Sequence, residues 1–289
     1  MELRAFHRFV NLCLTSPLKL MTDYLFIVNV GDDIVNSIII SSIVPNRRMR
    51  SIERIDFKLG VYMQKKSSTQ WKKMDEIFFS DSNNIKLSSC DYDMEVGQLA
   101  VIIPVDIGFE LGDNLSALPE PISRKTDTSP VNERAMISFR RGNSESSYQG
   151  EFPYLMSKIK GTFLAFDSLT HNRGGHVKNK LVFINIFSQE LLKKESFNLF
   201  MVNSVNKECV KEEHYEHNSA AIMNFNCKQN YQYAFYSKDT LGIPIFISYS
   251  DDNSNLSVEH THPPSEFFYG DNKFSYQQKL KSNWLSKLP

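Results

Sequence analysis

Short apolar runs separated by polar turns dominate the first half of the chain. The runs are rich in β-branched and aromatic residues, a composition typical of β-strands. We expect strands at Tyr24–Val30, Asn36–Val44, Ile55–Met63, Glu76–Ser80 and Gln98–Val105. The polar clusters between these runs are typical of turns, because Gly, Asp, Asn and Ser favour turn conformations.

The same pattern continues in the second half of the chain. We expect further strands at Ala135–Arg140, Gly161–Asp167, Leu181–Ser188, Phe197–Ser204, Ala220–Phe225, Tyr231–Ser237 and Ile243–Ser250. Helical periodicity is clear only in Phe274–Leu288, where Tyr276, Leu280 and Trp284 recur at intervals of four. This segment is predicted to form a short amphipathic helix at the C-terminal end.

Many short strands with few helices favour an all-β fold built from β-sandwich-like domains. Residues 112–133 hold three of the prolines and few large apolar residues, which is typical of a linker or long loop. We therefore expect a first sandwich at 21–111 and a second at 134–289, which includes the helix. Residues 1–20 are predicted to be an N-terminal extension or an amphipathic helix.

A weak similarity of pattern between the two halves of the sequence suggests the hypothesis of a tandem duplication. YLFIVNVGDD followed by NSIIISSIVPN resembles LVFINIFSQE followed by FNLFMVNSVN in the second half. Each half then ends on an apolar strand, QLAVIIPV or IPIFISYS. The match is one of pattern rather than of identical residues.

Charge and composition exclude several classes of function. The 289 residues contain 33 Lys and Arg against 33 Asp and Glu, and a nucleic-acid-binding protein usually has a basic excess. We therefore expect no nucleic-acid partner. No apolar run reaches the roughly 18 residues of a spanning helix, so no transmembrane segment is expected. The Gly-rich phosphate-binding loops are also missing from the sequence.

Four scattered cysteines form no CxxC pair, a pattern typical of buried free thiols in a reducing compartment. This predicts a cytoplasmic protein. The segment 1–20 carries Arg4 and Arg8 beside apolar residues at helical spacing, so peripheral membrane association through it is an alternative.

The densest chemical signal is LSVEHTHPPSEFFYG, near the C-terminal end. In an extended strand His260 and His262 project from one face, and Glu266 can turn back toward them. Two imidazoles and one carboxylate are the ligand set of open Zn, Fe or Mn sites. The alternative is a strand whose polar side chains only hold a loop by hydrogen bonds.

This HxHxxxE spacing resembles the first metal motif of the cupin family. The resemblance covers His260 to Glu266 and implies a small β-barrel whose metal is held by two His, one Glu and a later His. No histidine follows Gly270, so a fourth ligand would come from earlier in the chain. His214, His217 and His176 are the candidates for that position.

A second group of polar residues lies in THNRGGHVKNK, just before the Leu181–Ser188 strand. Arg173, with His171 and His176, is a candidate for binding an anionic or sugar ligand, because the guanidinium offers a planar bidentate fork. The alternative is an ordinary hairpin loop in which the two glycines allow positive φ.

These patterns lead to two competing expectations about function. The first is a binding or accessory protein that recognises a carbohydrate or protein partner through second-domain loops. The second is a metal-dependent enzyme with the cupin-like site, in which the metal would polarise an oxygen or activate water. Neither the reaction nor the oligomeric state follows from the sequence.

Overall fold

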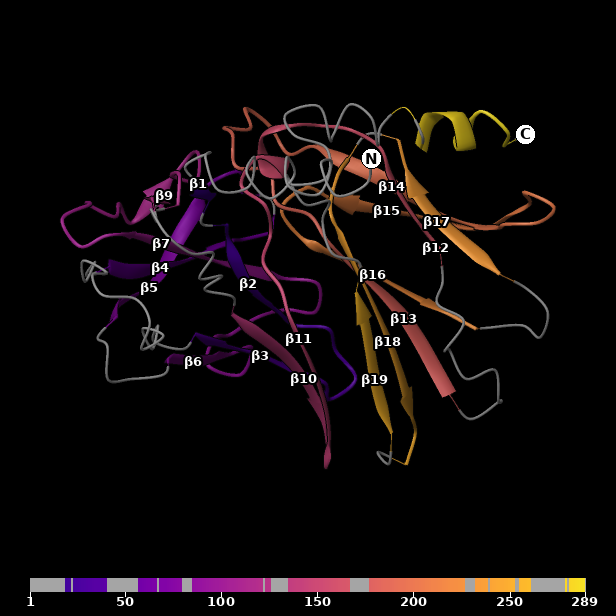
Figure 1. Ribbon diagram of the computed structural model, residues 1–289, viewed down its shortest axis with the longest axis horizontal. Helices are drawn as coiled ribbons and strands as arrows, with labels where there is room; N and C mark the ends of the chain where they lie inside the picture. Colours follow the sequence, from indigo (N-terminus) through magenta and orange to yellow (C-terminus); the bar gives the residue numbers. More distant parts are fainter. Residues whose placement is uncertain are drawn as a thin grey trace, which may run out of the picture.

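In the computed structural model the described part of the chain is nearly all β, with a short α-helix that includes residues 281–285 near the C-terminus (Figure 1). The structure describes residues 19–21, 23–40, 57–66, 68–79, 85–121, 123–125, 135–166, 177–226, 232–238, 240–252, 255–260, 279 and 281–288. The predicted all-β class is confirmed. No helix in the described part of the chain is long and apolar enough to cross a membrane.

The first half forms two antiparallel sheets and one short pair of strands. The five-stranded sheet has the order β2-β7-β4-β5-β8, and the four-stranded sheet has the order β11-β10-β3-β6. The strands are β1 (Lys19–Met21), β2 (Leu25–Val28), β3 (Val35–Ile40), β4 (Phe57–Gln64), β5 (Trp71–Phe79), β6 (Ile85–Ser88), β7 (Leu99–Asp106), β8 (Asn114–Leu115), β9 (Ser123–Lys125), β10 (Met136–Arg141) and β11 (Ser144–Gln149). Strands β1 and β9 pair with each other.

The second half forms two more antiparallel sheets, each of four strands. We call β16-β13-β18-β19 the central sheet and β12-β17-β14-β15 the outer sheet. The elements are the 3-10 helix η1 (Met156–Lys158), β12 (Phe163–Phe166), β13 (Val177–Ile184), β14 (Ser196–Asn203), β15 (Cys209–Glu216), β16 (Ala220–Phe225), β17 (Tyr233–Ser237), β18 (Ile243–Ser250) and β19 (Leu256–His260).

The four main sheets are arranged around a common centre, like the blades of a four-bladed propeller (Figure 1). This differs in detail from the expectation of two sandwiches. The largest hydrophobic cluster is shared between the halves, since it joins Ile38 and Val101 to Val182 and Ile245. The division into two sandwich domains, and their origin by duplication, therefore stay predictions.

The central sheet is buried on both faces. Along β13, Val182 and Ile184 belong to the large shared cluster, whereas Leu181 and Phe183 face a second cluster beneath the outer sheet. A strand that is covered on both sides needs apolar residues at consecutive positions rather than at alternate ones. This explains the continuous apolar runs in the sequence of β13 and β18.

A buried lysine ties the first half to the central sheet. Lys180 Nζ donates to the Asp32 carboxylate at 2.6 Å and to the Val30 carbonyl at 3.0 Å. The Tyr249 hydroxyl donates to the same Asp32 oxygen at 2.6 Å, and Arg141 Nε donates to the Asp32 carbonyl at 3.0 Å. Asp32 has a φ of 56°, in the left-handed region that Asp tolerates better than most residues. The carbonyl and the carboxylate of Asp32 thus accept hydrogen bonds from side chains of three strands, β10, β13 and β18.

Part of the predicted linker belongs to the folded body. Strand β8 pairs with β5, and Leu118 is buried with its N–H donating to the Ser188 carbonyl at 2.9 Å. The boundary between the domains stays a prediction. The thiols of Cys90 and Cys209 are free but exposed, rather than buried as expected, because one lies in a turn and the other begins the edge strand β15.

Candidate functional site

Several residues singled out in the sequence lie outside the described residues: His171, Arg173, His176, His262 and Glu266. Their roles in ligand and metal binding stay predictions. The structure does describe His214, His217 and His260, and it places them in three different surroundings.

His260 is the last residue of β19 and lies where the two halves meet. Its ring stacks on Tyr148 of β11, with ring centroids 3.9 Å apart and an angle of 25° between the planes. The Tyr148 hydroxyl is buried and has no hydrogen-bond partner among the described residues. Burial, and then the nearby Glu151 carboxylate, raise the pKa of Tyr148. A phenol that stays neutral therefore lies beside this imidazole.

His217 is buried in the turn after β15 and belongs to a hydrogen-bond network. Its Nδ1 lies 3.0 Å from Asn185 Oδ1, and the same oxygen accepts the N–H of Asn218 at 3.0 Å. The Asn185 amide nitrogen donates to the Thr240 hydroxyl at 2.7 Å. Because buried polar groups need such partners, this network explains His217 as a structural residue.

The structure does not bring His214 or His217 to His260. Strand β15 contacts β16, at the edge of the central sheet opposite to β19. At least three strand spacings, about 14 Å, therefore separate them. Within the described part of the chain, no group of three or more His, Cys, Asp or Glu residues gathers as metal ligands would.

His214 lies on the exposed side of the outer sheet, which we call the outer face. Side chains alternate along β14, so that Phe197, Leu199 and Met201 pack into the second core cluster. The residues between them, Asn198 and Phe200, point to the outer face. His214 pairs with Asn198 across the strands and therefore shares that face.

A polar row crosses the edge of the outer face. His214 Nδ1 lies 2.8 Å from Asn198 Oδ1, and Asn198 Nδ2 donates to Glu212 Oε1 at 2.8 Å. An amide oxygen only accepts, so His214 Nδ1 donates to it, and in the neutral imidazole this leaves Nε2 as an acceptor. The row therefore presents an imidazole nitrogen and a carboxylate, both of which accept hydrogen bonds.

An apolar row lies next to the polar one. The pairing register aligns Glu212 with Phe200, Phe200 with Tyr236, and Tyr236 with Leu164. The rings of Phe200 and Tyr236 stack with centroids 4.8 Å apart. Burial, and to a smaller extent the nearby Glu212 carboxylate, raises the pKa of Tyr236, so its hydroxyl stays neutral.

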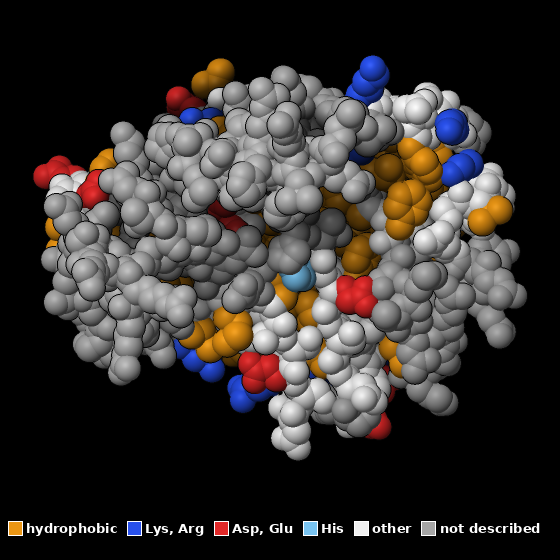
Figure 2. Space-filling view, viewed as in Figure 1, with side chains coloured by type: hydrophobic (Ala, Val, Ile, Leu, Met, Phe, Trp, Pro, Cys, Tyr) orange, Lys and Arg blue, Asp and Glu red, His pale blue; other side chains and the backbone are white. Residues whose placement is uncertain are grey.

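The C-terminal helix covers one end of the outer face. Leu285 packs against Val202 and Ala234, and the Trp284 ring meets Phe166 edge-on with centroids 5.4 Å apart. Figure 2 shows hydrophobic side chains gathered at the upper right of the molecule, where Figure 1 places β12, β17 and this helix. Phe166, which is 41% exposed, is the last residue before the undescribed segment with Arg173.

This arrangement joins two kinds of chemistry on one surface. The polar row can accept hydrogen bonds from hydroxyl groups, and the neighbouring aromatic and aliphatic side chains can pack on C–H groups. No cofactor is needed for either interaction.

The sequence pointed to His214 but not to Asn198, Glu212 or Phe200. The two-residue period of a strand places every second residue of FNLFMV and of KEEHYE on one face, but only FNLFMV was recognisable as a strand from its apolar residues. The pairing register between β14 and β15, however, cannot be deduced from the sequence of either strand. Only the folded sheet shows that the three residues are neighbours.

Comparison with known proteins gives no family assignment, because no family model, curated protein or solved structure matches this chain.

Proposed function

We propose that the protein is a binding module that recognises a neutral carbohydrate through the outer face of its outer sheet. The observation that carries this proposal is the contact between the two rows. The acceptor Glu212 lies directly opposite Phe200, whose ring stacks on the buried Tyr236, and His214 lies in the neighbouring row beside Asn198. A sugar ring combines hydroxyl donors at its edge with C–H groups on its face, and this surface complements both.

The charge of the polar row favours a neutral sugar over an acidic one. Glu212 would repel a ligand carboxylate, whereas it accepts hydrogen bonds from hydroxyls. The segment 167–176 directly follows Phe166 at this face, so Arg173 and its two neighbouring histidines are candidates to extend the binding surface. The proposal therefore keeps His171, Arg173 and His176 as predicted ligand-binding residues.

The test is a screen of neutral oligosaccharides by ligand-dependent shift of the melting temperature, followed by calorimetric titration of any that bind. His214→Ala and Phe200→Ala should each weaken binding about tenfold, since each removes one of the two interactions. Glu145→Gln and Phe78→Ala are matched controls, because both residues are exposed on strands of the first half. Binding that both outer-face variants leave unchanged would refute the proposal.

The alternative is a metal-dependent enzyme whose ligands include His260, His262 and Glu266. The observation in its favour is the place of His260, which stacks on Tyr148 where the two halves meet, and the Glu151 carboxylate lies near that tyrosine. A metal held there would act as a Lewis acid or activate water.

Elemental analysis of the purified protein for Zn, Fe and Mn tests this alternative. The enzyme hypothesis predicts about one metal ion per chain in the wild type and its loss in His262→Ala. His214→Ala is the control and should keep the metal. A trace amount that does not change in His262→Ala would end this hypothesis without affecting the carbohydrate proposal.

A further inference from the structure

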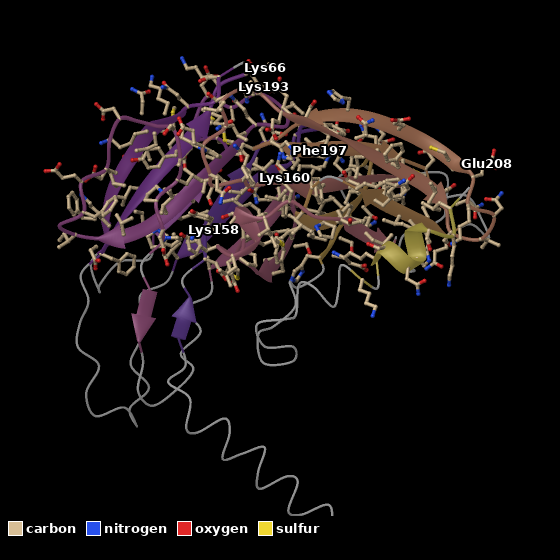
Figure 3. All side chains as sticks on the ribbon, turned by 90° about the horizontal axis from the view of Figure 1, so that it is seen from above. Lys66, Lys158, Lys160, Lys193, Phe197 and Glu208 are labelled. Atoms are coloured by element: carbon tan, nitrogen blue, oxygen red, sulfur yellow. The ribbon has the colours of Figure 1, made fainter. Side chains whose placement is uncertain are left out.

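A group of lysines gathers on one side of the molecule, where the first and second halves meet. We call it the lysine surface, and its members are Lys65, Lys66, Lys158, Lys160, Lys193 and Lys194. Figure 3 labels four of them and shows them as a band that runs between the two halves. They come from the turn after β4, from η1 and the residues after it, and from the loop between β13 and β14.

Contacts between these segments hold the surface together. Lys194 Nζ donates to Gln64 Oε1 at 3.3 Å, which ties the β13–β14 loop to the end of β4. The Ser188 N–H donates to the Ser157 carbonyl at 2.9 Å, which ties the start of the same loop to η1. The lysines therefore come from three segments that are fixed relative to one another.

Exposed aliphatic side chains lie among these lysines. Leu192 is 95% exposed, although its neighbour Leu191 is buried. Leu155 and Ile159, each 39% exposed, lie three residues before and one residue after Lys158. A leucine this exposed contributes almost nothing to the core and adds apolar surface beside the lysines.

The charge of the surface is positive but modest. Lys66, Lys160 and Lys194 pair with Glu95, Glu195 and Glu216 respectively. The other three lysines have no ion pair among the described residues, while one exposed carboxylate, Glu190, lies in the β13–β14 loop. The whole chain is neutral, so any attraction to an anion comes from this local excess.

We propose that the lysine surface docks reversibly onto a membrane that contains anionic lipids. Leu192 would enter the interfacial region, where Leu155 and Ile159 approach the acyl boundary and the lysines reach the headgroups. A single protruding leucine flanked by lysines fits a soft, negatively charged layer better than it fits the flat, well-packed surface of a protein. The proposal does not depend on the carbohydrate site, which lies on the outer sheet, or on residues 1–20.

The test is sedimentation of the full chain with vesicles of phosphatidylcholine, with and without phosphatidylserine. We expect binding only to the anionic vesicles, and binding should weaken as salt is added because exposed charges are screened. Leu192→Ser should lower the partition coefficient about tenfold, through lost apolar burial. Lys158→Gln combined with Lys193→Gln should lower it about tenfold, through lost attraction to the headgroups.

Matched controls separate this surface from the rest of the molecule. Val205→Ser removes an aliphatic side chain that is 79% exposed in the turn between β14 and β15, and Lys86→Gln removes an exposed charge on β6. Both controls should bind vesicles as the wild type does. The proposal is overturned if the wild type ignores anionic vesicles, or if Leu192→Ser and the lysine variant bind as tightly as the controls. Binding to soluble polyglutamate without binding to vesicles would point to an acidic protein partner and would also overturn it.

Discussion

The central sheet and the outer sheet are neighbours in the second half, yet their surroundings differ. Both faces of the central sheet are covered by hydrophobic clusters, and it carries the buried Lys180. The outer sheet is fully covered on one face, whereas the C-terminal helix covers only one end of its other face, which carries His214 and the Phe200–Tyr236 stack. Substitutions in the central sheet should therefore cost stability, whereas substitutions in the exposed polar row of the outer face should change binding and leave the fold intact.

The largest effect is expected for Phe183→Ala. The Phe183 side chain is fully buried between the central and outer sheets, and it contacts the rings of Phe163 and Phe197. Its removal should lower the free energy of unfolding by about 3–5 kcal/mol, measured by urea denaturation. Phe78→Ala, at an exposed phenylalanine, should cost less than about 1 kcal/mol. Equal losses in the two variants would contradict the contrast between the sheets.

A smaller and asymmetric effect is expected at the Lys180–Asp32 pair. The Lys180 side chain is buried, whereas the Asp32 side chain is half exposed. Asp32→Asn leaves a buried ammonium without its counter-charge and should cost about 2 kcal/mol, while Lys180→Met leaves a carboxylate that water can solvate and should cost about 1 kcal/mol or less. Asn suits the left-handed φ at this position, so the backbone is not disturbed. The reverse order of the two losses in urea denaturation would refute this account.

The same pair predicts a dependence of stability on pH. Hydrogen bonds from Lys180 and then from Tyr249 lower the pKa of Asp32. A carboxyl group with a lowered folded-state pKa contributes stability above the unfolded pKa, near about 4, and this contribution is lost as the pH falls below it. The difference in unfolding free energy between wild type and Asp32→Asn should therefore shrink between pH 6 and pH 3. A constant difference would show that the carboxylate charge is not what stabilises the junction.

The smallest effect on stability is expected for His214→Ala. The side chain is exposed at the edge strand and its described partner is Asn198, so the free energy of unfolding should change by no more than about 0.5 kcal/mol. The same variant should weaken carbohydrate binding, as proposed above. A loss of stability comparable to that of Asp32→Asn would mean that the outer face has a structural role.

Three strands that the sequence did not reveal lie at the edges of their sheets. The apolar runs at β4, β7, β13, β14 and β18 were predicted, and these strands have a neighbour on each side. The sequence pattern gave no strand for β6, β11 and β15, and each of these lies at the edge of its sheet. Strand β15 has charged residues on both faces, and such residues protect an edge against pairing with other chains. These three edge strands therefore lack the apolar pattern by which strands are recognised, whereas the edge strands β2, β12 and β16 carry it and were predicted.

The candidate site was predictable only in part, for a related reason. The sequence identified His214 and His217 as one group, because they are three residues apart. The structure separates them, since His214 projects from β15 to the outer face and His217 is buried in the turn that follows. The residues that do surround His214 come from β14 and β17, and the register that aligns these strands depends on the packing of the whole sheet.

The sequence by itself determined the all-β class, most of the interior strands and the short C-terminal helix, because local apolar patterns encode them. It also determined the local chemistry of each segment, such as the lysines beside Leu192. Tertiary structure alone decided which face of each strand is covered, because burial depends on what packs above it. The tertiary structure also brings Lys180 within hydrogen-bond distance of Asp32. It aligns the acceptors of β15 with the aromatic rings of β14 and β17. Contacts between residues so far apart in the chain arise only when the sheets assemble around a shared core.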